Sequence, residues 1–176
     1  MRIFFAVFPP SEIQEQAERL QIGLPNTRWE PLENLHITLL FLGEIPSSKL
    51  ENIAESAHSL SLSQFFISFR SVRVFRNSRD SVLWTEAVPS DSLERLNLEL
   101  KKISSSLGVI VQEKEFTPHM TLGRIKKFNE SKFLEYAGLF CDFKTEEFSV
   151  NQFCLVSSVL NPSGSKYRIL ETFSLA

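Results

Sequence analysis

The tetrapeptide His-x-Thr-Leu occurs twice in this chain, first at His36–Leu39 and again 83 residues later at His119–Leu122. The sequence holds only three histidines among 176 residues, so chance would place two of them in this pattern roughly once in ten thousand such sequences. The same spacing relates Ser48-Lys49-Leu50 to Ser131-Lys132-Phe133. A constant spacing over successive segments indicates an internal duplication, and we expect two equivalent lobes with a ligand-binding cleft between them.

Hydrophobic periodicity predicts strand, helix, strand, helix and strand, in that order, in each half of the chain. The first half has predicted strands over Ile3–Phe8, Leu35–Leu42 and Phe65–Phe75, and helices that begin at Pro10–Ser11 and Pro46–Ser48 and carry apolar stripes to Leu24 and Leu60. The second half has predicted strands over Val82–Val88, around His119–Ile125, over Thr145–Leu160 and over Tyr167–Ser174, with helices over Asp91–Leu107 and from Asn129 to Phe140.

Local signals refine this outline. The apolar residues of the third strand change face near Ser71, which predicts a bulge, and the strand over 145–160 is expected to break near Asn151. Turns are predicted at 77–80 and at Asn161–Gly164. A further match, at a spacing of 80, aligns Val7-Phe8-Pro9 with Ala87-Val88-Pro89. Because no linker-like stretch divides the chain, we expect one bilobal domain over residues 1–176, with pseudo-repeats of about 1–78 and 79–176.

The composition excludes several classes of protein. Hydrophobic residues make up 43% of the chain, which is too many for intrinsic disorder, and no apolar run approaches the roughly 20 residues that span a bilayer. A net charge of −2 disfavours a surface built for long nucleic-acid duplexes but permits a small or single-stranded anionic ligand. We expect most of the sixteen phenylalanines to be core residues, and Cys141 and Cys154 to be reduced, buried thiols of a cytoplasmic protein.

The repeated motif carries chemistry as well as symmetry. Side chains alternate along a strand, so His36 and Thr38 share one face, and His119 and Thr121 share the equivalent face. Two imidazoles can act as a proton acceptor and a proton donor near neutral pH, which hydrolysis of a phosphodiester requires, while threonine hydroxyls donate to phosphate oxygens. Arg124 is a candidate phosphate clamp, although strict alternation puts it on the opposite face unless a bulge lies near Gly123.

Other interpretations of these residues compete with the catalytic one. A single His-x-Thr is more often structural, but its duplication favours a functional pair. A metal site has little support, since no His-x-His, HExxH or cysteine cluster is present. No Gly-x-Ser-x-Gly elbow or glycine-rich phosphate loop occurs either. Solvated or core roles are favoured for the remaining candidates, which are His58, the arginines at 70, 73, 76 and 79, and the aromatic residues Trp29, Phe41 and Trp84.

Several stretches of this sequence, including both His-x-Thr-Leu motifs, resemble the 2H phosphoesterase superfamily, and within it the bacterial and archaeal RNA 2′,3′-cyclic phosphodiesterases, historically called 2′-5′ RNA ligases. The similar stretches are Arg2–Val7, Trp29, Glu33–Leu39, Phe41–Gly43, Val82–Trp84, Phe116–Arg124 and Ser158–Leu160 with Tyr167. The resemblance implies a bilobal, duplicated α+β fold, with antiparallel sheets that line a central cleft and helices outside.

The resemblance also implies a reaction and a set of roles. The reaction is metal-independent and cofactor-free opening of an RNA 2′,3′-cyclic phosphate to a 2′-phosphomonoester, with 2′-5′ ligation as a side activity. His36 corresponds to the proton donor and His119 to the proton acceptor, while Thr38, Thr121 and Arg124 bind the phosphate. One departure is Leu40, where relatives often carry lysine.

Two alternatives stay open at this point. One is a related phosphodiesterase for small cyclic nucleotides, ADP-ribose cyclic phosphate or 2′-5′ oligoadenylates. The other is a non-catalytic module that binds RNA ends. For the leading hypothesis we expect a cytoplasmic monomer without a membrane partner, a bell-shaped pH profile and activity that is insensitive to chelators.

Overall fold

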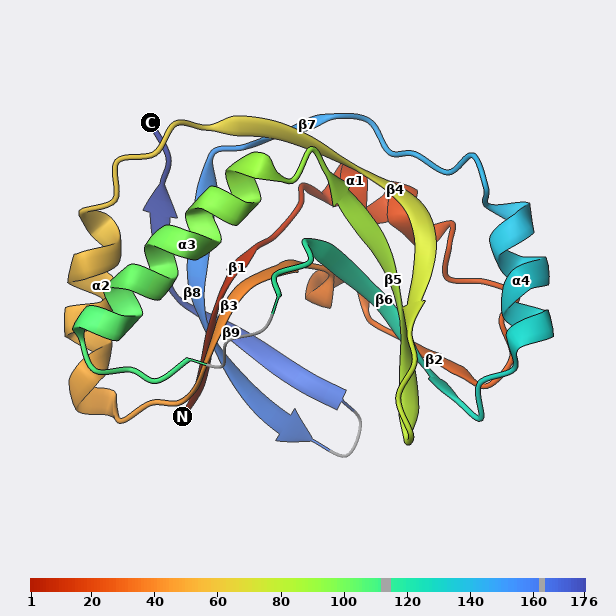
Figure 1. Ribbon diagram of the computed structural model, residues 1–176, viewed down its shortest axis with the longest axis horizontal. Helices are drawn as coiled ribbons and strands as arrows, with labels where there is room; N and C mark the ends of the chain where they lie inside the picture. Colours follow the sequence, from red (N-terminus) through yellow and green to blue (C-terminus); the bar gives the residue numbers. More distant parts are fainter. Residues whose placement is uncertain (112–114, 162–163) are drawn as a thin grey trace.

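The computed structural model describes residues 1–111, 115–161 and 164–176, and in these ranges nine strands form one curled antiparallel sheet (Figure 1). Eight strands follow the order β7-β4-β5-β6-β3-β1-β8-β9, and β2 pairs with the part of β6 that β3 leaves free. The strands are β1 (Arg2–Val7), β2 (Thr27–Trp29), β3 (Ile37–Glu44), β4 (Phe65–Phe75), β5 (Asp80–Val88), β6 (His119–Lys126), β7 (Phe148–Val150), β8 (Gln152–Asn161) and β9 (Gly164–Ser174).

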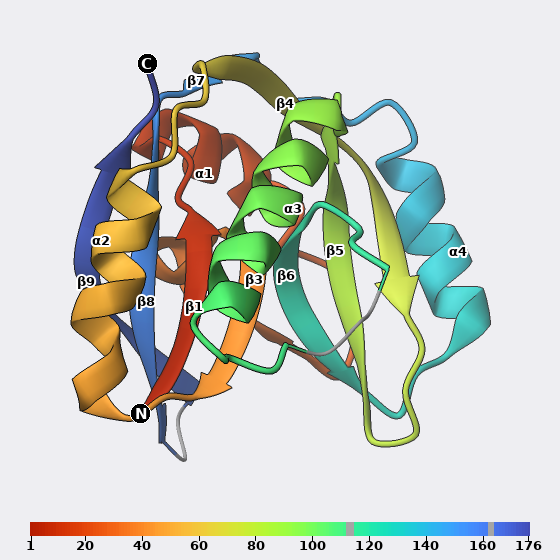
Figure 2. The ribbon, with the colours of Figure 1, turned by 60° about the vertical axis from the view of Figure 1, so that its left-hand side comes forward.

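Helices pack against both halves of this sheet (Figure 2). One group, α2 (Leu50–His58) and α3 (Asp91–Ser106), lies over the half of the sheet that contains β3, β1, β8 and β9. On the other half, α4 (Glu130–Leu139) packs on β4, and α1 (Ser11–Glu18) precedes a segment that contacts α4. Two 3₁₀ turns, η1 (Leu32–Asn34) and η2 (Ser47–Lys49), complete the described elements.

In two places, a segment that connects strands of one half of the sheet packs against the other half. Helix α3 connects β5 to β6, yet it packs on β3, where the amide of Asn97 donates a 2.6 Å hydrogen bond to the carbonyl of Leu39. Helix α1 connects β1 to β3 by way of β2, yet the residues that follow it contact α4, since the Tyr136 hydroxyl donates to the carbonyl of Leu20. Each lobe is therefore assembled from distant parts of the chain.

Alternation along β1 separates two apolar clusters. Ile3, Phe5 and Val7 face the main core beneath the helices, whereas Phe4 and Ala6 join a smaller cluster on the concave face. Each large apolar side chain buried in this way contributes about 1.5–3 kcal/mol of transfer free energy. Both faces of β1 are thus covered, which explains its continuous apolar sequence.

The order of strands and helices predicted from the sequence is confirmed, as are the bulge at Ser71 and the break at Asn151. The sequence does not predict strand β2, because three residues are too few to show alternation. The first two helices end at Glu18 and His58, before Leu24 and Leu60. Part of the predicted turn at 161–164, Pro162 and Ser163, lies outside the described residues.

One sequence match between the expected repeats needs adjustment. Val7 pairs with Ile37, and Thr85 pairs with Met120. Because Ile37 and Met120 hold the same position in the two motifs, Val7 corresponds to Thr85. The sequence match of Val7 with Ala87 is therefore wrong by two residues. The boundary near residue 78 falls in the turn between β4 and β5, which pair with each other. Each lobe consequently contains strands from both halves of the sequence.

Burial tests two expectations drawn from composition. Cys154 is buried, but Cys141 is exposed after the end of α4, so the prediction of two buried thiols is wrong for Cys141. Six phenylalanines are buried and most others are half-buried against the core, whereas Phe41 and Phe66 are exposed. Among the described residues, no helix has the length and apolar character to cross a membrane.

Candidate functional site

The two His-x-Thr motifs meet where the halves of the sheet join. Strands β3 and β6 are linked by a single antiparallel pair, Ile37 with Met120, and both of these side chains are fully buried in the core. In antiparallel register the neighbours of this pair face the opposite, concave side, so one motif's histidine lies beside the other motif's threonine. The predicted pseudo-symmetric juxtaposition of the two motifs is therefore present.

A bulge in β6 brings Arg124 onto the face that carries the second motif's histidine. Thr121 pairs with Trp84 and Arg124 pairs with Val82, so one extra residue of β6 lies between two consecutive same-face residues of β5. The register shift falls at Leu122–Gly123, where the sequence requires it. His119, Thr121 and Arg124 accordingly share one face, and the objection from strand parity is removed.

The space for this bulge is created by a missing side chain. A Cβ atom at Gly123 would lie 2.9 Å from the carbonyl oxygen of Arg28 and 3.0 Å from the ring of Trp29. Glycine therefore permits β2 to pair closely with β6, and β2 in turn carries Arg28 beside Arg124.

The equivalent bulge in β3 has a different result. Thr38 pairs with Ala6 and Phe41 pairs with Phe4, so Leu39 and Leu40 both turn into the core and Phe41 is placed on the concave face. The ring of Phe41 is 45% exposed and lies 5.2 Å from the guanidinium of Arg2. The expectation that Phe41 packs in the core is thus wrong, because alternation does not continue through the bulge.

Backbone carbonyls fix the tautomer of both motif histidines. The Nδ1 atom of His36 lies 2.6 Å from the carbonyl of Asn34, and that of His119 lies 2.6 Å from the carbonyl of Thr117. A carbonyl only accepts, so each Nδ1 carries a proton, and each Nε2 is left to exchange protons with a ligand. The Nε2 of His36 also lies 3.1 Å from the hydroxyl of Thr38.

Aromatic rings enclose His36. It is surrounded by Phe4, Phe8 and Tyr167, with ring centroids 5.2, 5.4 and 5.0 Å away. These rings hold the imidazole in place and exclude water from it. They come from β1, from the residue after β1 and from β9, and no motif in the sequence marks them as neighbours of His36.

His119 has a less complete enclosure. Two rings contact it, Phe75 at 5.1 Å and Trp84 at 5.4 Å, and they stack on each other at 4.6 Å. Trp84 is only 5% exposed and pairs with Thr121, so it supports His119 from the neighbouring strand β5 on the same face of the sheet. Phe75 is half-buried at the end of β4, and the sequence alone gives no sign of its contact with His119.

Burial shifts the titration of both histidines in the same direction. Loss of hydration lowers the pKa of His36 from its usual 6.5 to about 4, partly opposed by the hydrogen bond to Asn34 and assisted by the nearby charge of His119. Burial also lowers the pKa of His119, again against the effect of its backbone hydrogen bond. In the free protein at neutral pH both imidazoles are neutral, so a proton donor must acquire its proton when an anion binds.

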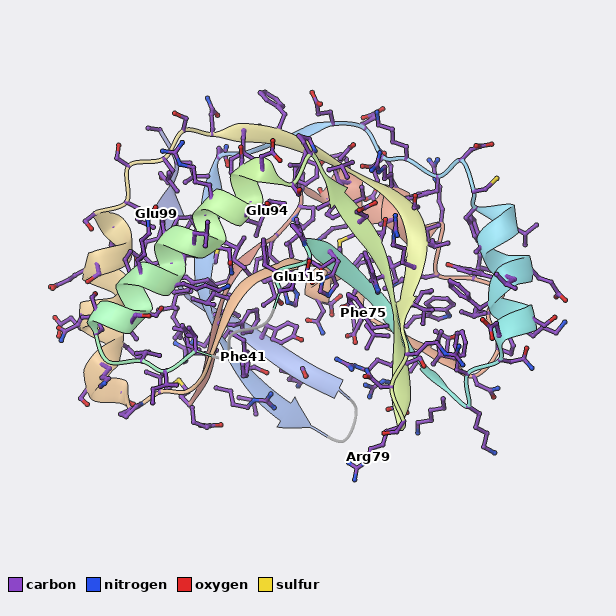
Figure 3. All side chains as sticks on the ribbon, in the orientation of Figure 1. Phe41, Phe75, Arg79, Glu94, Glu99 and Glu115 are labelled. Carbon is purple, nitrogen blue, oxygen red and sulfur yellow. The ribbon has the colours of Figure 1, made fainter. Side chains whose placement is uncertain are left out.

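A cavity of about 630 Å³ lies beside this group, large enough for a nucleotide-sized ligand. Figure 3 labels three residues that line it, with Phe41 and Phe75 on either side of Glu115. Of the predicted site residues, Thr38, His119 and Arg124 line this cavity directly. Its other lining residues are Leu39, Leu40, Asn97, Lys101, Phe116 and Thr117.

The remaining two predicted residues complete the group from the sides. His36 reaches the cavity through its hydrogen-bonding partner Thr38, and Thr121 is half-buried on the same face of β6 as His119. Arg124 is held by Glu30, whose carboxylate lies 3.7 Å from its Nε atom. This pair is partly exposed and leaves the terminal nitrogens of the guanidinium free to bind an anion.

The other candidates have structural roles. Trp29 is half-buried and packs on the core, and His58 is exposed, 3.5 Å from Glu171. Arg70 and Arg73 of β4 both donate to the carboxylate of Glu86, which partly compensates their positive charge. All four arginines are exposed on the strand and turn, as the solvated interpretation predicts: Arg70, Arg73, Arg76 and Arg79.

Comparison with known proteins agrees with this geometry. The chain matches the family model described as "LigT like Phosphoesterase" over residues 7–84 and 86–167. It is 33% identical to an RNA 2′,3′-cyclic phosphodiesterase of Archaeoglobus fulgidus (98% of this chain, 99% of the relative) and 34% identical to one of Thermotoga maritima (97% and 93%). A solved structure from Thermus thermophilus aligns with a TM-score of 0.82 at 29% identity (99% and 98%). The chain therefore belongs to the LigT-like phosphoesterase family, within the 2H phosphoesterase superfamily.

Proposed function

We propose that this protein hydrolyses RNA 2′,3′-cyclic phosphate ends to 2′-phosphomonoesters. The observation that carries the proposal is the pair of histidines from equivalent strands, each with Nδ1 fixed as a donor and Nε2 free, beside a cavity that holds Arg124. The names of the relatives at about a third identity support the same substrate. A binding module needs neither two titrating groups nor their fixed tautomers.

The two Nε2 atoms have opposite roles in the reaction, one as proton acceptor and the other as proton donor. A water molecule attacks phosphorus while Nε2 of His119 takes its proton. The bond from phosphorus to the 3′ oxygen breaks, and protonated Nε2 of His36 gives its proton to that oxygen, leaving the phosphate on the 2′ oxygen. Loss of the proton from His119 to solvent then restores the free protein, and His36 takes up a proton again when the next substrate binds.

Three side chains stabilise the charge that develops on the non-bridging oxygens. Thr38 and Thr121 donate hydroxyl hydrogen bonds from the two lobes, and Arg124 adds a charge-assisted donor. The Thr38 hydroxyl already contacts Nε2 of His36, so it links the phosphate to the proton donor. Glu30 keeps the guanidinium oriented without neutralising it in a buried pair.

The low pKa of His36 couples protonation to substrate binding. With a pKa of about 4 in the free protein, His36 is neutral before the substrate arrives. A phosphodiester anion next to Nε2 replaces the missing hydration and raises that pKa, so the donor form is created in the complex. His119 acts in its neutral form as the proton acceptor.

The cavity wall also suits a nucleoside. Phe41 is exposed on one side and Phe75 is half-buried on the other, and both line the cavity next to His119. An aromatic ring stacks on any base, typically with about 1–3 kcal/mol per base. We assign the terminal base to this cavity, which agrees with a substrate defined by its cyclic phosphate more than by its sequence.

Three finer points belong to the same proposal. We infer a cytoplasmic protein, supported by two free cysteines, because thiols persist in reducing compartments. We infer a monomer, since the site draws on both lobes of one chain. Ligation of 2′-5′ ends is the same ring-opening displacement with a 5′-hydroxyl RNA in place of water, and it is a side activity of the same groups.

The decisive experiment incubates the protein with 2′,3′-cyclic AMP and with a short RNA that ends in a cyclic phosphate, in buffer containing EDTA. The expected product is the 2′-phosphate, resolved from the 3′-phosphate by chromatography, with no loss of rate caused by the chelator. Formation of the 3′-phosphate would contradict the assigned geometry, and a rate that requires an added divalent metal would contradict the two-histidine mechanism. Folded protein without any turnover would favour the binding module.

A further inference from the structure

A second cavity adjoins the one beside the histidines. It has a volume of about 360 Å³, and the side chain of Arg124 lines both cavities. The two spaces therefore share one guanidinium, the group to which the proposed function assigns the reacting phosphate. The second cavity is lined by Asn26, Thr27, Arg28, Asp80, Arg124 and Lys126.

Strand register places these residues in two rows on the concave face. The first row is Val82, Arg124 and Arg28, across β5, β6 and β2, and the second begins with the pair Asp80 and Lys126. Since a strand rises about 3.3 Å per residue, Lys126 lies about 7 Å beyond Arg124 along β6, on the side away from His119. The two rows therefore extend away from His119, beyond the position proposed for the reacting phosphate.

Two cations of this second cavity are available to a ligand. Arg28 and Lys126 are exposed, and neither forms an ion pair with a carboxylate within the described ranges of the chain. Asp80 is the one acidic side chain among the described lining residues. The chain as a whole has a net charge of −2, so a local excess of positive charge here is not a property of the general surface. Figure 3 places Arg79 at the tip of the adjoining β4–β5 hairpin.

We propose that Arg28 and Lys126 form a second phosphate subsite, which binds the phosphodiester on the 5′ side of the terminal nucleotide. The inference rests on the proposed function, because it takes the cyclic phosphate to lie at Arg124. An RNA chain has its next phosphate one nucleotide away from the cyclic end, whereas a 2′,3′-cyclic mononucleotide without a 5′-phosphate has none. The subsite therefore selects oligoribonucleotide ends over mononucleotides.

The test compares kcat/KM for three substrates: 2′,3′-cyclic AMP, the same nucleotide with a 5′-phosphate, and a diadenylate that ends in a cyclic phosphate. In Arg28→Ala and Lys126→Ala, the preference for the diadenylate over 2′,3′-cyclic AMP should fall about fivefold to tenfold, as expected for loss of a hydrogen bond of ordinary net strength at an exposed site. The nucleotide with a 5′-phosphate should lose its advantage to the same extent. Lys132→Ala is the matched control, since that lysine pairs with Glu135 on the outer helix α4.

Salt dependence provides a second readout. Each lost phosphate contact should reduce the slope of log kcat/KM against log salt concentration by about 0.7 for a single strand. An unchanged substrate preference in both variants would overturn the subsite. A loss confined to the diadenylate would overturn the assignment to phosphate, since the cavity would then bind the preceding nucleoside. If the wild-type protein cleaves none of the substrates, the proposed function fails, and that outcome is distinct from failure of the subsite.

Discussion

The two lobes use one backbone device for two purposes. In both β3 and β6 a bulge follows the His-x-Thr motif and turns the residue five positions after the histidine onto the concave face. In β6 this residue is Arg124, a cation suited to a phosphate, and in β3 it is Phe41, an exposed ring suited to a base. A duplicated framework has thus kept the same motif in both lobes and specialised the position beside it.

The residues and elements that pack behind the two bulges also differ. On the β3 side Leu40 fills the core, and Asn97 of α3 satisfies the carbonyl of Leu39. On the β6 side Gly123 has no side chain, and β2 occupies the adjoining space. The lobe with a helical support presents an apolar ring, and the lobe with an added strand presents cations. Substitutions in the two lobes test this division of roles.

Removal of either histidine should have the largest effect on turnover. We expect His36→Ala and His119→Ala each to lower kcat for 2′,3′-cyclic AMP by about 10²- to 10⁴-fold, because each abolishes one proton transfer. Circular dichroism and a thermal melt provide the control for folding. Near-wild-type turnover in either folded variant would remove that histidine from the mechanism and end the equivalence of the two lobes.

The unequal enclosure of the two histidines predicts an acid-sensitive stability. Above pH 6.5 His36 is neutral in both folded and unfolded states. Between pH 6.5 and 4 the unfolded chain binds a proton that folded His36, with its lowered pKa of about 4, does not. The free energy of unfolding should therefore fall by about 3 kcal/mol across this window from His36 alone.

Urea titrations of the wild type and of His36→Gln at a series of pH values measure this effect. The variant should lose much of the decrease in stability between pH 6.5 and 4, whatever its stability at pH 7. An identical pH dependence in both proteins would show that His36 is hydrated in the folded state and that its aromatic enclosure is open.

Substitutions at the two bulges should separate phosphate binding from base binding. We expect Arg124→Ala to lower kcat/KM about 10- to 100-fold on every cyclic phosphate, since it removes a charge-assisted hydrogen bond. Phe41→Ala should raise KM by a similar or smaller factor, and only for substrates with a base. Ribose 2′,3′-cyclic phosphate, which lacks a base, is the discriminating substrate, and equal losses on it from both variants would contradict the division of roles.

The smallest expected effect concerns the close contact behind the β6 bulge. Gly123→Ala puts a Cβ atom 2.9 Å from the backbone oxygen of Arg28, so we expect a loss of about 1–3 kcal/mol in unfolding free energy. Gly138→Ala in α4 is the control, because a Cβ atom there would meet nothing within 4 Å beyond its chain neighbours and its own helix backbone. Equal stability of the two variants would indicate that β2 can shift without cost.

The sequence predicts the placement of the candidate reacting groups well because they are encoded locally. A repeated motif, alternation along a strand and the requirement for a bulge near Gly123 are sufficient to bring His119 and Arg124 to one face. The same reasoning does not place Phe41, since the bulge in β3 depends on pairing with β1. It also misses Phe75 and Tyr167, which reach the histidines from strands far along the chain. Local patterns specify the candidate groups, whereas non-local register specifies what encloses them.

The pairing of β1 with β8 and the contact of Tyr167 with His36 have a consequence for the order of synthesis. Tyr167 follows His36 by 131 residues in the sequence, so the ribosome makes the first histidine long before it makes the ring that encloses it. A nascent chain that stops after the second motif carries both histidines but lacks β8 and β9 of one lobe and β7 at the edge of the other. Catalytic competence should therefore appear late in translation, once the β8–β9 hairpin has been added beside the first strand.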